Sequence, residues 1–178
     1  VAVRGEKLRF TFRGKSGKMH DVDVEDRRIA KLVRVLQELP GQELFHYVGD
    51  DGEVHPIGSA DVNDYLREVS GESFTAKDFR TWGGTVAAAR ALAELPPATS
   101  ATAGKRLVVD AVKRVAEQLG NTAAVCRKCY IHPSVVDAFL AGTTVRIVES
   151  SSNGRGHGLT PEERAVLQLL RAKASTKR

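Results

Sequence analysis

Two adjacent prolines, Pro96-Pro97, separate two long segments that each carry apolar residues at helical spacing. Proline lacks an amide hydrogen and its ring clashes with the preceding helical turn, so no helix is expected to continue through this pair. Residues 75–95 and residues 105–119 are therefore predicted to form separate helices, each with one buried face. Gly120 suits the end of the second helix, because glycine readily adopts the left-handed conformation found there. The chain is thus expected to have a helical core.

Before these helices, alternating apolar and polar residues predict a β-hairpin over residues 7–24, with Lys15 in its turn. A lysine in a turn commonly serves only solubility, but at a hairpin tip it can also reach a site made by another part of the chain. Asp26 is expected to cap a helix that ends near Leu39. A second hairpin or loop is expected over residues 44–57.

The remaining segments also read as helices. Ser59 or Asp61 is expected to cap a helix that Gly71 ends. Short helices are expected over residues 121–128 and 134–142, and a last one from Thr160. The segment from Ser150 to Gly158 is rich in serine and glycine and is expected to be mobile. The predicted fold class is mainly α with a small N-terminal β-hairpin element.

The chain is moderately basic, with 27 lysines and arginines against 22 aspartates and glutamates, a net charge of +5. Lys105-Arg106 and Lys113-Arg114 lie about two helical turns apart and can share one face. Such a face is either ordinary solvated surface or a basic stripe that fits a phosphate backbone. No apolar run approaches the ~18 residues needed to cross a bilayer. The net positive charge and the lack of a long apolar run favour a polyanionic partner over a membrane.

A short segment places Tyr130 close to two cations, Arg127 and Lys128. A free phenol has a pKa of about 10, so a tyrosine nucleophile needs a base or an electrophile polarised by positive charge. Cys126 and Cys129 have the CxxC spacing of metal and redox sites. A zinc site needs two more ligands, and the cations between the cysteines would repel a metal, so reduced thiols are the better interpretation.

Arg80 lies in the first turn of the helix predicted over residues 75–95, where Thr75 and Asp78 form a capping box. A cation at this end opposes the helix dipole. Arg80 is therefore expected either to pair with a nearby carboxylate such as Asp78 or to be held there because it binds an anion.

Five blocks of the sequence recur together, in this order, in one family. They are Phe12-Arg13-Gly14-Lys15, Pro40-Gly41-Gln42-Glu43-Leu44-Phe45, Asp61-Val62-Asn63-Asp64-Tyr65-Leu66, Lys77-Asp78-Phe79-Arg80-Thr81-Trp82, and Gly120-Asn121-Thr122 followed by Val125-Cys126-Arg127-Lys128-Cys129-Tyr130. With them, the chain resembles the C-terminal catalytic domain of type IB DNA topoisomerases, in their short bacterial and poxvirus-like form. One block alone would be a weak signal, but several in order are specific. The resemblance runs from about residue 7 to residue 142.

The resemblance implies a fold of the topoisomerase IB and tyrosine recombinase kind, and an enzyme that relaxes supercoils without ATP, metal or another cofactor. It implies that Tyr130 attacks a phosphodiester of double-stranded DNA and forms a 3′-phosphotyrosyl bond, which is religated after strand rotation. Arg80 would bind the non-bridging phosphate oxygens, and Lys15 would protonate the 5′-hydroxyl leaving group. DNA contacts are expected from Lys18, Lys77, Lys105, Arg106, Arg127 and Lys128.

Two features depart from the family pattern. Asn121 stands nine residues before Tyr130, where the poxvirus enzymes have a histidine; an amide can donate a hydrogen bond to a phosphate oxygen but cannot protonate, so its expected role is orientation or neutral stabilisation. His132 lies on the other side of the tyrosine and is expected to make a local helix or surface contact. The family's further arginine lies well upstream of Lys15 and has no match here, so the N-terminal DNA-clamp domain is expected to be absent from this chain.

These expectations divide the chain into a catalytic domain over residues 1–149, made of the hairpin 7–24 and a helical core 26–142, and a mobile segment with a helix over 150–178. The protein is expected to act as a monomer in the cytoplasm, at the bacterial nucleoid. Two alternatives remain open. A tyrosine recombinase-like enzyme is disfavoured because the sequence contains no His-x-x-Arg motif. A DNA-binding module would keep the fold without the covalent chemistry.

Overall fold

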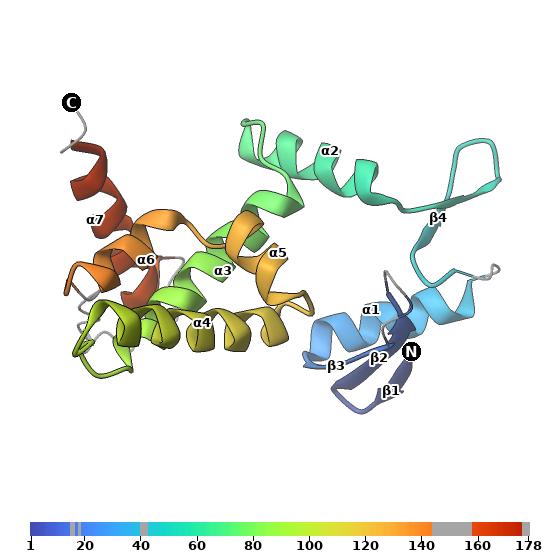
Figure 1. Cartoon of the computed structure of the whole chain (residues 1–178). Helices are drawn as coiled ribbons and strands as arrows, with labels where there is room; N and C mark the ends of the chain where they lie inside the picture. Colours follow the sequence, from blue (N-terminus) through green and yellow to red (C-terminus); the bar gives the residue numbers. More distant parts are fainter. Residues whose placement is uncertain (15–16, 18, 40–42, 144–157, 176–178) are drawn as a thin grey trace. The chain divides into compact units, whose positions relative to one another are not determined.

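The computed structural model describes residues 1–14, 17, 19–39, 43–143 and 158–175. It divides into two compact units, Val1–Phe74 and Thr75–Arg178, and each unit is described by itself (Figure 1). Three sets of positions that the sequence singled out lie outside the described residues: Lys15 and Lys18, residues 40–42 of the second family block, and residues 150–157 of the serine- and glycine-rich segment.

The N-terminal unit begins with a three-stranded antiparallel sheet and a helix. These elements are β1 (Ala2–Arg4), β2 (Lys7–Arg13), β3 (Met19–Glu25) and α1 (Arg27–Glu38). β2 and β3 form the predicted hairpin, with Phe12 opposite His20 and their rings stacked at 5.1 Å. β1, which the sequence did not predict, pairs with the other edge of β2. A small cluster of Leu8, Ala30 and Val33 joins the sheet to α1.

The predicted cap of α1 is confirmed. The Asp26 carboxylate accepts hydrogen bonds from the amides of Arg28 at 2.7 Å and Ile29 at 3.0 Å. These backbone donors stabilise the charged form, and they hold the pKa of Asp26 below its usual value.

The rest of the N-terminal unit is a short hairpin and a second helix. These elements are β4 (His46–Val48), β5 (Val54–Pro56) and α2 (Ser59–Ser70). The residue that caps α2 is Gly58 instead of Ser59 or Asp61, because the Asp61 side chain reaches back to accept the Gly58 amide at 2.8 Å. Gly71 ends the helix in the left-handed conformation, with φ of 67°. None of the residues of α2 is buried.

The C-terminal unit consists of helices in the part that the structure describes. They are α3 (Ala76–Ala93), α4 (Ala101–Gln118), α5 (Ala123–Cys129), α6 (Pro133–Leu140) and α7 (Pro161–Ser175). α3 contacts α4, α6 and α7 and forms the centre of this unit (Figure 1). The predicted capping box of α3 is present: the Asp78 carboxylate accepts the Thr75 amide at 2.9 Å and its hydroxyl at 2.6 Å. The long central helix is therefore fixed at its start by its own sequence.

α4 begins four residues earlier than the sequence predicted. Ser100 caps it by accepting the Ala103 amide at 3.1 Å. A Cβ at Gly104 would lie 3.1 Å from both Ala98 and Leu140, so a glycine in this first turn permits close packing. The small residues of this stretch, interpreted as a linker, thus form the start of a packed helix.

α7 is part of the core of the C-terminal unit. Val166 is fully buried in the main apolar cluster, and the Trp82 indole donates a 2.9 Å hydrogen bond to Glu163 at the start of α7. The cluster combines side chains of α3, α4, α5, α6 and α7, and its best-buried members are Ala88, Ala89, Ala111, Val115, Cys126, Val135 and Val166. The helix predicted beyond residue 160 exists, and it packs on the same core as α3.

The predicted fold class is confirmed at its coarser level: the chain is mainly helical with small sheets in its N-terminal part. Among the described residues, no helix combines the length and apolar character that crossing a membrane requires.

Candidate active site around Tyr130

Tyr130 lies directly after α5, a short helix that the core holds in place. Cys126 has no exposed surface, and burial raises the pKa of its thiol. Thr122 caps the helix by accepting the Val125 amide at 3.3 Å. The Tyr130 amide closes the last turn on the Cys126 carbonyl at 2.9 Å. The tyrosine therefore projects from a short helix whose start and inner face are both fixed.

Arg80 reaches Tyr130 from the start of α3. Its guanidinium carbon lies 5.1 Å from the centre of the Tyr130 ring, in a cation–π arrangement. The same guanidinium donates a hydrogen bond to the Leu119 carbonyl at 3.0 Å. Asp78, the alternative partner, instead caps α3, and the hydrogen bond from Thr75 holds the pKa of this carboxyl below its usual value. Arg80 is directed at the tyrosine and the end of α4.

Asn121 converges on the same carbonyl oxygen. Its side-chain amide donates to the Leu119 carbonyl at 2.9 Å. Gly120, with φ of 65°, turns the chain just after α4, and the Asn121 amide donates to the Ala116 carbonyl at 2.8 Å. Three residues predicted for one site, Tyr130, Arg80 and Asn121, are thus brought together at the C-terminal end of α4. Two side-chain donors thus point at one oxygen, and a phosphate oxygen at this position could accept both hydrogen bonds.

Residues 1–144 match the family described as eukaryotic DNA topoisomerase I, catalytic core. The chain is also 30% identical over 139 residues to the DNA topoisomerase 1B of Acanthamoeba polyphaga mimivirus, an alignment that covers 74% of this chain and 41% of the relative. The chain belongs to the type IB DNA topoisomerase family. It spans less than half of the length of this curated relative.

The chain has further polar residues near Tyr130 that the sequence analysis did not assign to this site. The Thr81 hydroxyl donates to the Lys77 carbonyl at 2.8 Å and lies 3.3 Å from the Cys129 carbonyl. The Thr85 hydroxyl accepts the His132 amide at 3.1 Å. The sequence does carry one signal for Thr81 and Thr85. Threonine is a weak helix former, so two threonines one turn apart in a largely apolar helix indicate a role other than helix formation.

His132 has the local role that was predicted for it. It precedes α6 as its N-cap, and its Nδ1 accepts the Ser134 amide at 3.2 Å. Pro133 follows at the first helical position, where a missing amide hydrogen costs nothing.

The cations expected to contact DNA are exposed where the structure describes them. Lys77 lies at the start of α3, and Arg127 and Lys128 lie in the last turn of α5, where a positive charge is favourable to the helix dipole. On α4, the exposed side chains include Lys105, Arg106, Lys113 and Arg114. Lys113 pairs with Asp110 at 3.8 Å. Lys18 and the predicted general acid Lys15 lie outside the described residues.

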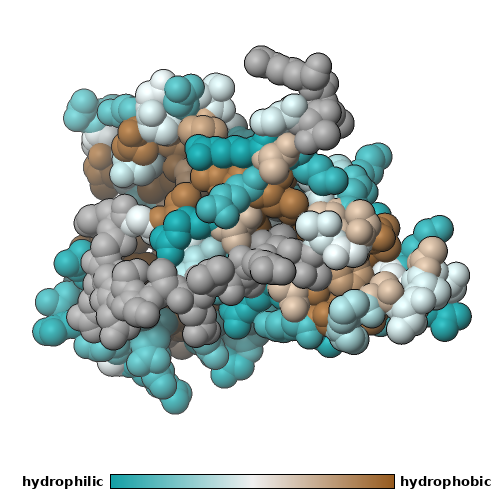
Figure 2. All heavy atoms as spheres, turned by 90° about the vertical axis from the view of Figure 1, so that its left-hand side faces the viewer, coloured by the Kyte–Doolittle hydropathy of each residue, from teal (hydrophilic) through white to brown (hydrophobic). Residues whose placement is uncertain are grey.

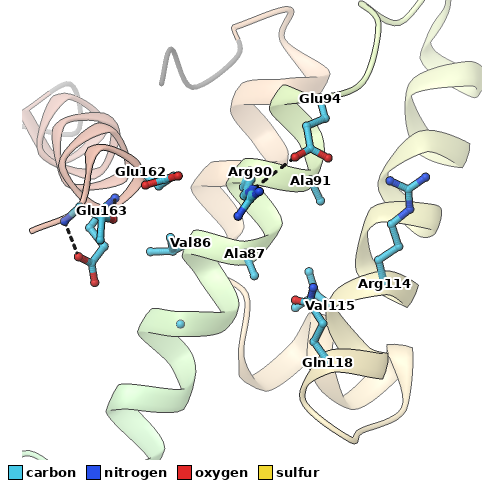
Figure 3. A pocket seen from close by; sticks show the side chains of 12 residues that line it. Val86, Ala87, Arg90, Ala91, Glu94, Arg114, Val115, Gln118, Glu162 and Glu163 are labelled. Carbon is cyan, nitrogen blue, oxygen red and sulfur yellow. Dashed lines mark hydrogen bonds and ion pairs between the residues drawn. The ribbon is translucent and has the colours of Figure 1, made fainter. Parts of the chain in front are cut away.

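A groove elsewhere in the C-terminal unit is not the candidate site. It has a volume of about 670 Å³ and lies between α3, α4 and the start of α7. Figure 3 shows charges of both signs around it, with Arg90 paired to Glu94 at 3.3 Å and Arg114 on the facing helix. In Figure 2, hydrophobic and hydrophilic side chains are likewise interspersed on the coloured surface. The residues that line the groove include neither Tyr130 nor Arg80.

Proposed function

We propose that this chain is a catalytic fragment of a type IB DNA topoisomerase that cuts one strand of double-stranded DNA with Tyr130. The carrying observation is the convergence of Arg80 and Asn121 on one acceptor position beside the tyrosine. Membership of the family supports the proposal, and so does the mimivirus relative, whose name is DNA topoisomerase 1B. The structural fold is proposed to be that of the topoisomerase IB and tyrosine recombinase catalytic domains.

In the proposed reaction the Tyr130 oxygen attacks the scissile phosphorus while the bond from phosphorus to the 5′-oxygen breaks. The phenol loses its proton to solvent, and Lys15 gives a proton to the departing 5′-oxygen. Negative charge grows on the non-bridging oxygens during the transfer, and Arg80 is placed to stabilise it with charge-assisted hydrogen bonds. The 3′-phosphotyrosyl bond keeps the energy of the original phosphodiester. Rotation of the free strand and the reverse attack therefore relax supercoils without ATP.

Asn121 has a narrower part in this proposal. Its amide can donate a hydrogen bond to a phosphate oxygen, but it brings no proton and no charge. The Leu119 carbonyl holds the donors of Asn121 and Arg80 when no phosphate is bound. A phosphate oxygen offers the same two donors a charged acceptor in place of a neutral one, which makes shorter and stronger hydrogen bonds.

DNA binding is assigned to exposed cations and to Lys18 of the predicted hairpin turn. In the proposal these are Lys18, Lys77, Lys105, Arg106, Arg127 and Lys128, and the protein acts as a monomer. The proposed catalytic domain comprises residues 1–149, and α7 packs against its helical core. The proposed location is the cytoplasm, at a bacterial nucleoid. The mimivirus relative, which is viral, does not support the bacterial part of this proposal.

A covalent trap tests the nucleophile. The chain is mixed with a duplex whose cut releases a short 5′-hydroxyl fragment, so that religation fails and the adduct accumulates. A denaturing gel should then show DNA joined to protein through the 3′ side of the cut. Tyr130→Phe should remove this band, whereas Tyr65→Phe, an exposed tyrosine on α2, should keep it.

Other outcomes separate the alternatives. A chain that binds the duplex, with affinity falling steeply as salt rises, but never forms the band is either a DNA-binding module or a fragment that needs the family's upstream arginine. Repeating the assay with the upstream region restored separates these two: a band then appears only for the fragment. A band that survives Tyr130→Phe means that another residue is the nucleophile, and the proposed site is then wrong.

A further inference from the structure

Thr85 is a buried polar side chain in the middle of α3, with 2% of its surface exposed. Its hydroxyl donates its single hydrogen to the Thr81 carbonyl one turn earlier, at 2.7 Å. Such a bond is common for a threonine inside a helix. The same oxygen also accepts the His132 amide at 3.1 Å and lies 3.5 Å from the Tyr130 carbonyl. These contacts join α3 to the backbone on both sides of Ile131, 45 and 47 residues further along the chain.

Gly84, the neighbour of Thr85, lets the two backbones approach. A Cβ placed on Gly84 would lie 2.6 Å from the Tyr130 carbonyl oxygen and 3.3 Å from the Tyr130 Cβ. The first of these distances is shorter than real side chains adopt, so any other residue here would move the tyrosine. Glycine weakens a helix interior, and the close approach explains why this position has no side chain.

α3 therefore carries Arg80 and, through Thr85, also contacts the backbone on both sides of Ile131. Arg80, which is aimed at the phosphate position, precedes Thr85 by five residues, about 7.5 Å along a helix. A helix of this kind is rigid, so the hydroxyl at Thr85 fixes the tyrosine backbone against the same element that holds the arginine. An unsupported turn after α5 would instead let the tyrosine move independently of Arg80.

We infer that Thr85 is a positioning residue for the nucleophile: its hydroxyl, beside the bare backbone of Gly84, sets the distance between Tyr130 and the anion held by Arg80. This inference rests on the proposed function, since it concerns how the tyrosine is presented to the phosphate. Thr85 touches no reacting atom. Its effect passes through the His132 amide and the Tyr130 backbone.

Thr85→Val tests the hydroxyl, because valine keeps the shape of threonine and removes its polar atom. At saturating DNA, we expect the single-turnover rate of adduct formation to fall on the order of 10- to 100-fold, as for other small misplacements of a reacting group. The affinity for DNA should stay within about twofold, since no DNA-contacting cation is altered. Thr85→Ser, which keeps the hydroxyl, should restore most of the rate.

Two further readouts separate positioning from mere stability. Hydrogen exchange of the His132 amide, followed by NMR, should accelerate in Thr85→Val and stay slow in Thr85→Ser. A substrate with sulfur in place of the 5′-bridging oxygen releases a thiolate that needs no proton, so it should rescue Lys15→Ala but leave the Thr85→Val defect in place. Val166→Ala is the matched control, because it removes buried volume from the same core away from the turn. It should lower thermal stability without lowering the rate of the folded protein.

The inference is overturned if Thr85→Val reacts at the wild-type rate, or if Val166→Ala slows the folded protein as much. It is also overturned if serine fails to restore the rate. Should valine prevent folding, Thr85→Ala replaces it, since alanine places no methyl group against the Tyr130 carbonyl. A wild-type chain that forms no adduct even with the upstream region restored is a different result, which refutes the proposed function itself and this inference with it.

Discussion

The two units of the chain differ in how much apolar side chain they bury. In the part that the structure describes, the C-terminal unit has a cluster of fourteen buried residues, whereas the N-terminal cluster consists of Leu8, Ala30 and Val33. α1 and α2 of the N-terminal unit leave large apolar side chains exposed, Leu32 at 58% and Tyr65 at 62% among them. Burial of apolar surface is the main source of stability, so the C-terminal unit is expected to be the firmer of the two.

The residues proposed for attack and the residue proposed for proton delivery lie in different units. Tyr130, Arg80 and Asn121 belong to the unit with the large core, where their separation can be fixed. Lys15 belongs to the lightly packed unit, and a proton donor needs to reach the leaving group only for one step. The comparison suggests that attack depends on rigid packing and that proton delivery does not. Four predictions test it, from the largest expected effect to the smallest.

Lys15→Ala should give the largest effect on an otherwise intact protein. General acid catalysis contributes about 10²- to 10⁴-fold, so the cleavage rate on an ordinary substrate should fall by that factor. With sulfur at the 5′-bridging position, the rate should return to near the wild-type value. Lys7→Ala, an exposed lysine of β2 that pairs with Glu25 at 3.8 Å, is the control and should cleave normally. A defect of Lys15→Ala that sulfur does not relieve would remove the lysine from proton transfer.

Core truncations compare the stability of the two units directly. Phe139→Ala in the C-terminal core should cost about 3–5 kcal/mol, and Leu8→Ala in the small cluster should lie near the lower end of about 2–5 kcal/mol. Amide exchange by mass spectrometry should show faster opening only in the unit that carries the substitution. If Leu8→Ala accelerates exchange equally in α3 and α4, the chain unfolds as one cooperative body and the comparison fails.

Arg80→Ala and Asn121→Ala compare a charged donor with a neutral one within the C-terminal unit. Removing the arginine should lower the cleavage rate about 10²- to 10³-fold, the usual loss for a donor to a developing oxyanion. Removing the asparagine should cost about fivefold, since a hydrogen bond from a neutral donor is worth about 1 kcal/mol. Arg90→Ala, on the same helix and paired with Glu94, is the control and should keep the rate. Equal losses for both residues would mean that charge is not what Arg80 contributes.

The smallest effects should come from the two helix caps, Asp26 in the N-terminal unit and Asp78 in the C-terminal unit. Hydrogen bonds lower the pKa of both carboxyls below the ordinary value of 3.8. Each carboxylate therefore stabilises its folded unit above pH 3.8, and this contribution disappears as the pH falls through the lowered pKa. Asp26→Asn and Asp78→Asn should each reduce the urea midpoint at pH 7, with differences from the wild type that shrink towards pH 2. A difference that does not change with pH would rule out the charge as its source.

The elements that the sequence predicted well are those with local signals. The capping residues Asp26, Thr75 and Asp78 act within one turn, and the prolines after α3 end it without help from other parts of the chain. β1 was missed because three residues carry too little of an alternating pattern. The start of α4 was missed because its small residues resemble a linker, and only packing of Gly104 against Ala98 and Leu140 favours a helix there.

The candidate site divides in the same way. The residue types of Tyr130, Arg80 and Asn121 were recognisable from the motifs around them. The convergence of Arg80 and Asn121 on the Leu119 carbonyl beside Tyr130 was not, because Arg80 reaches that carbonyl across 39 positions of the chain. Thr85 belongs to this second class. A threonine inside a largely apolar helix is a local signal, but it does not tell whether the hydroxyl bonds across the core or only within its helix.

The burial of Val166 has a consequence for where the chain can be truncated. The family match ends at residue 144, yet the core that supports Tyr130 and Arg80 is completed by a helix that begins at Pro161. The family match and the packed core therefore end at different residues. A chain truncated at residue 144 would expose Trp82 and its neighbours to water. Insolubility of such a truncated chain would then reflect the lost helix and say nothing about the proposed catalytic residues.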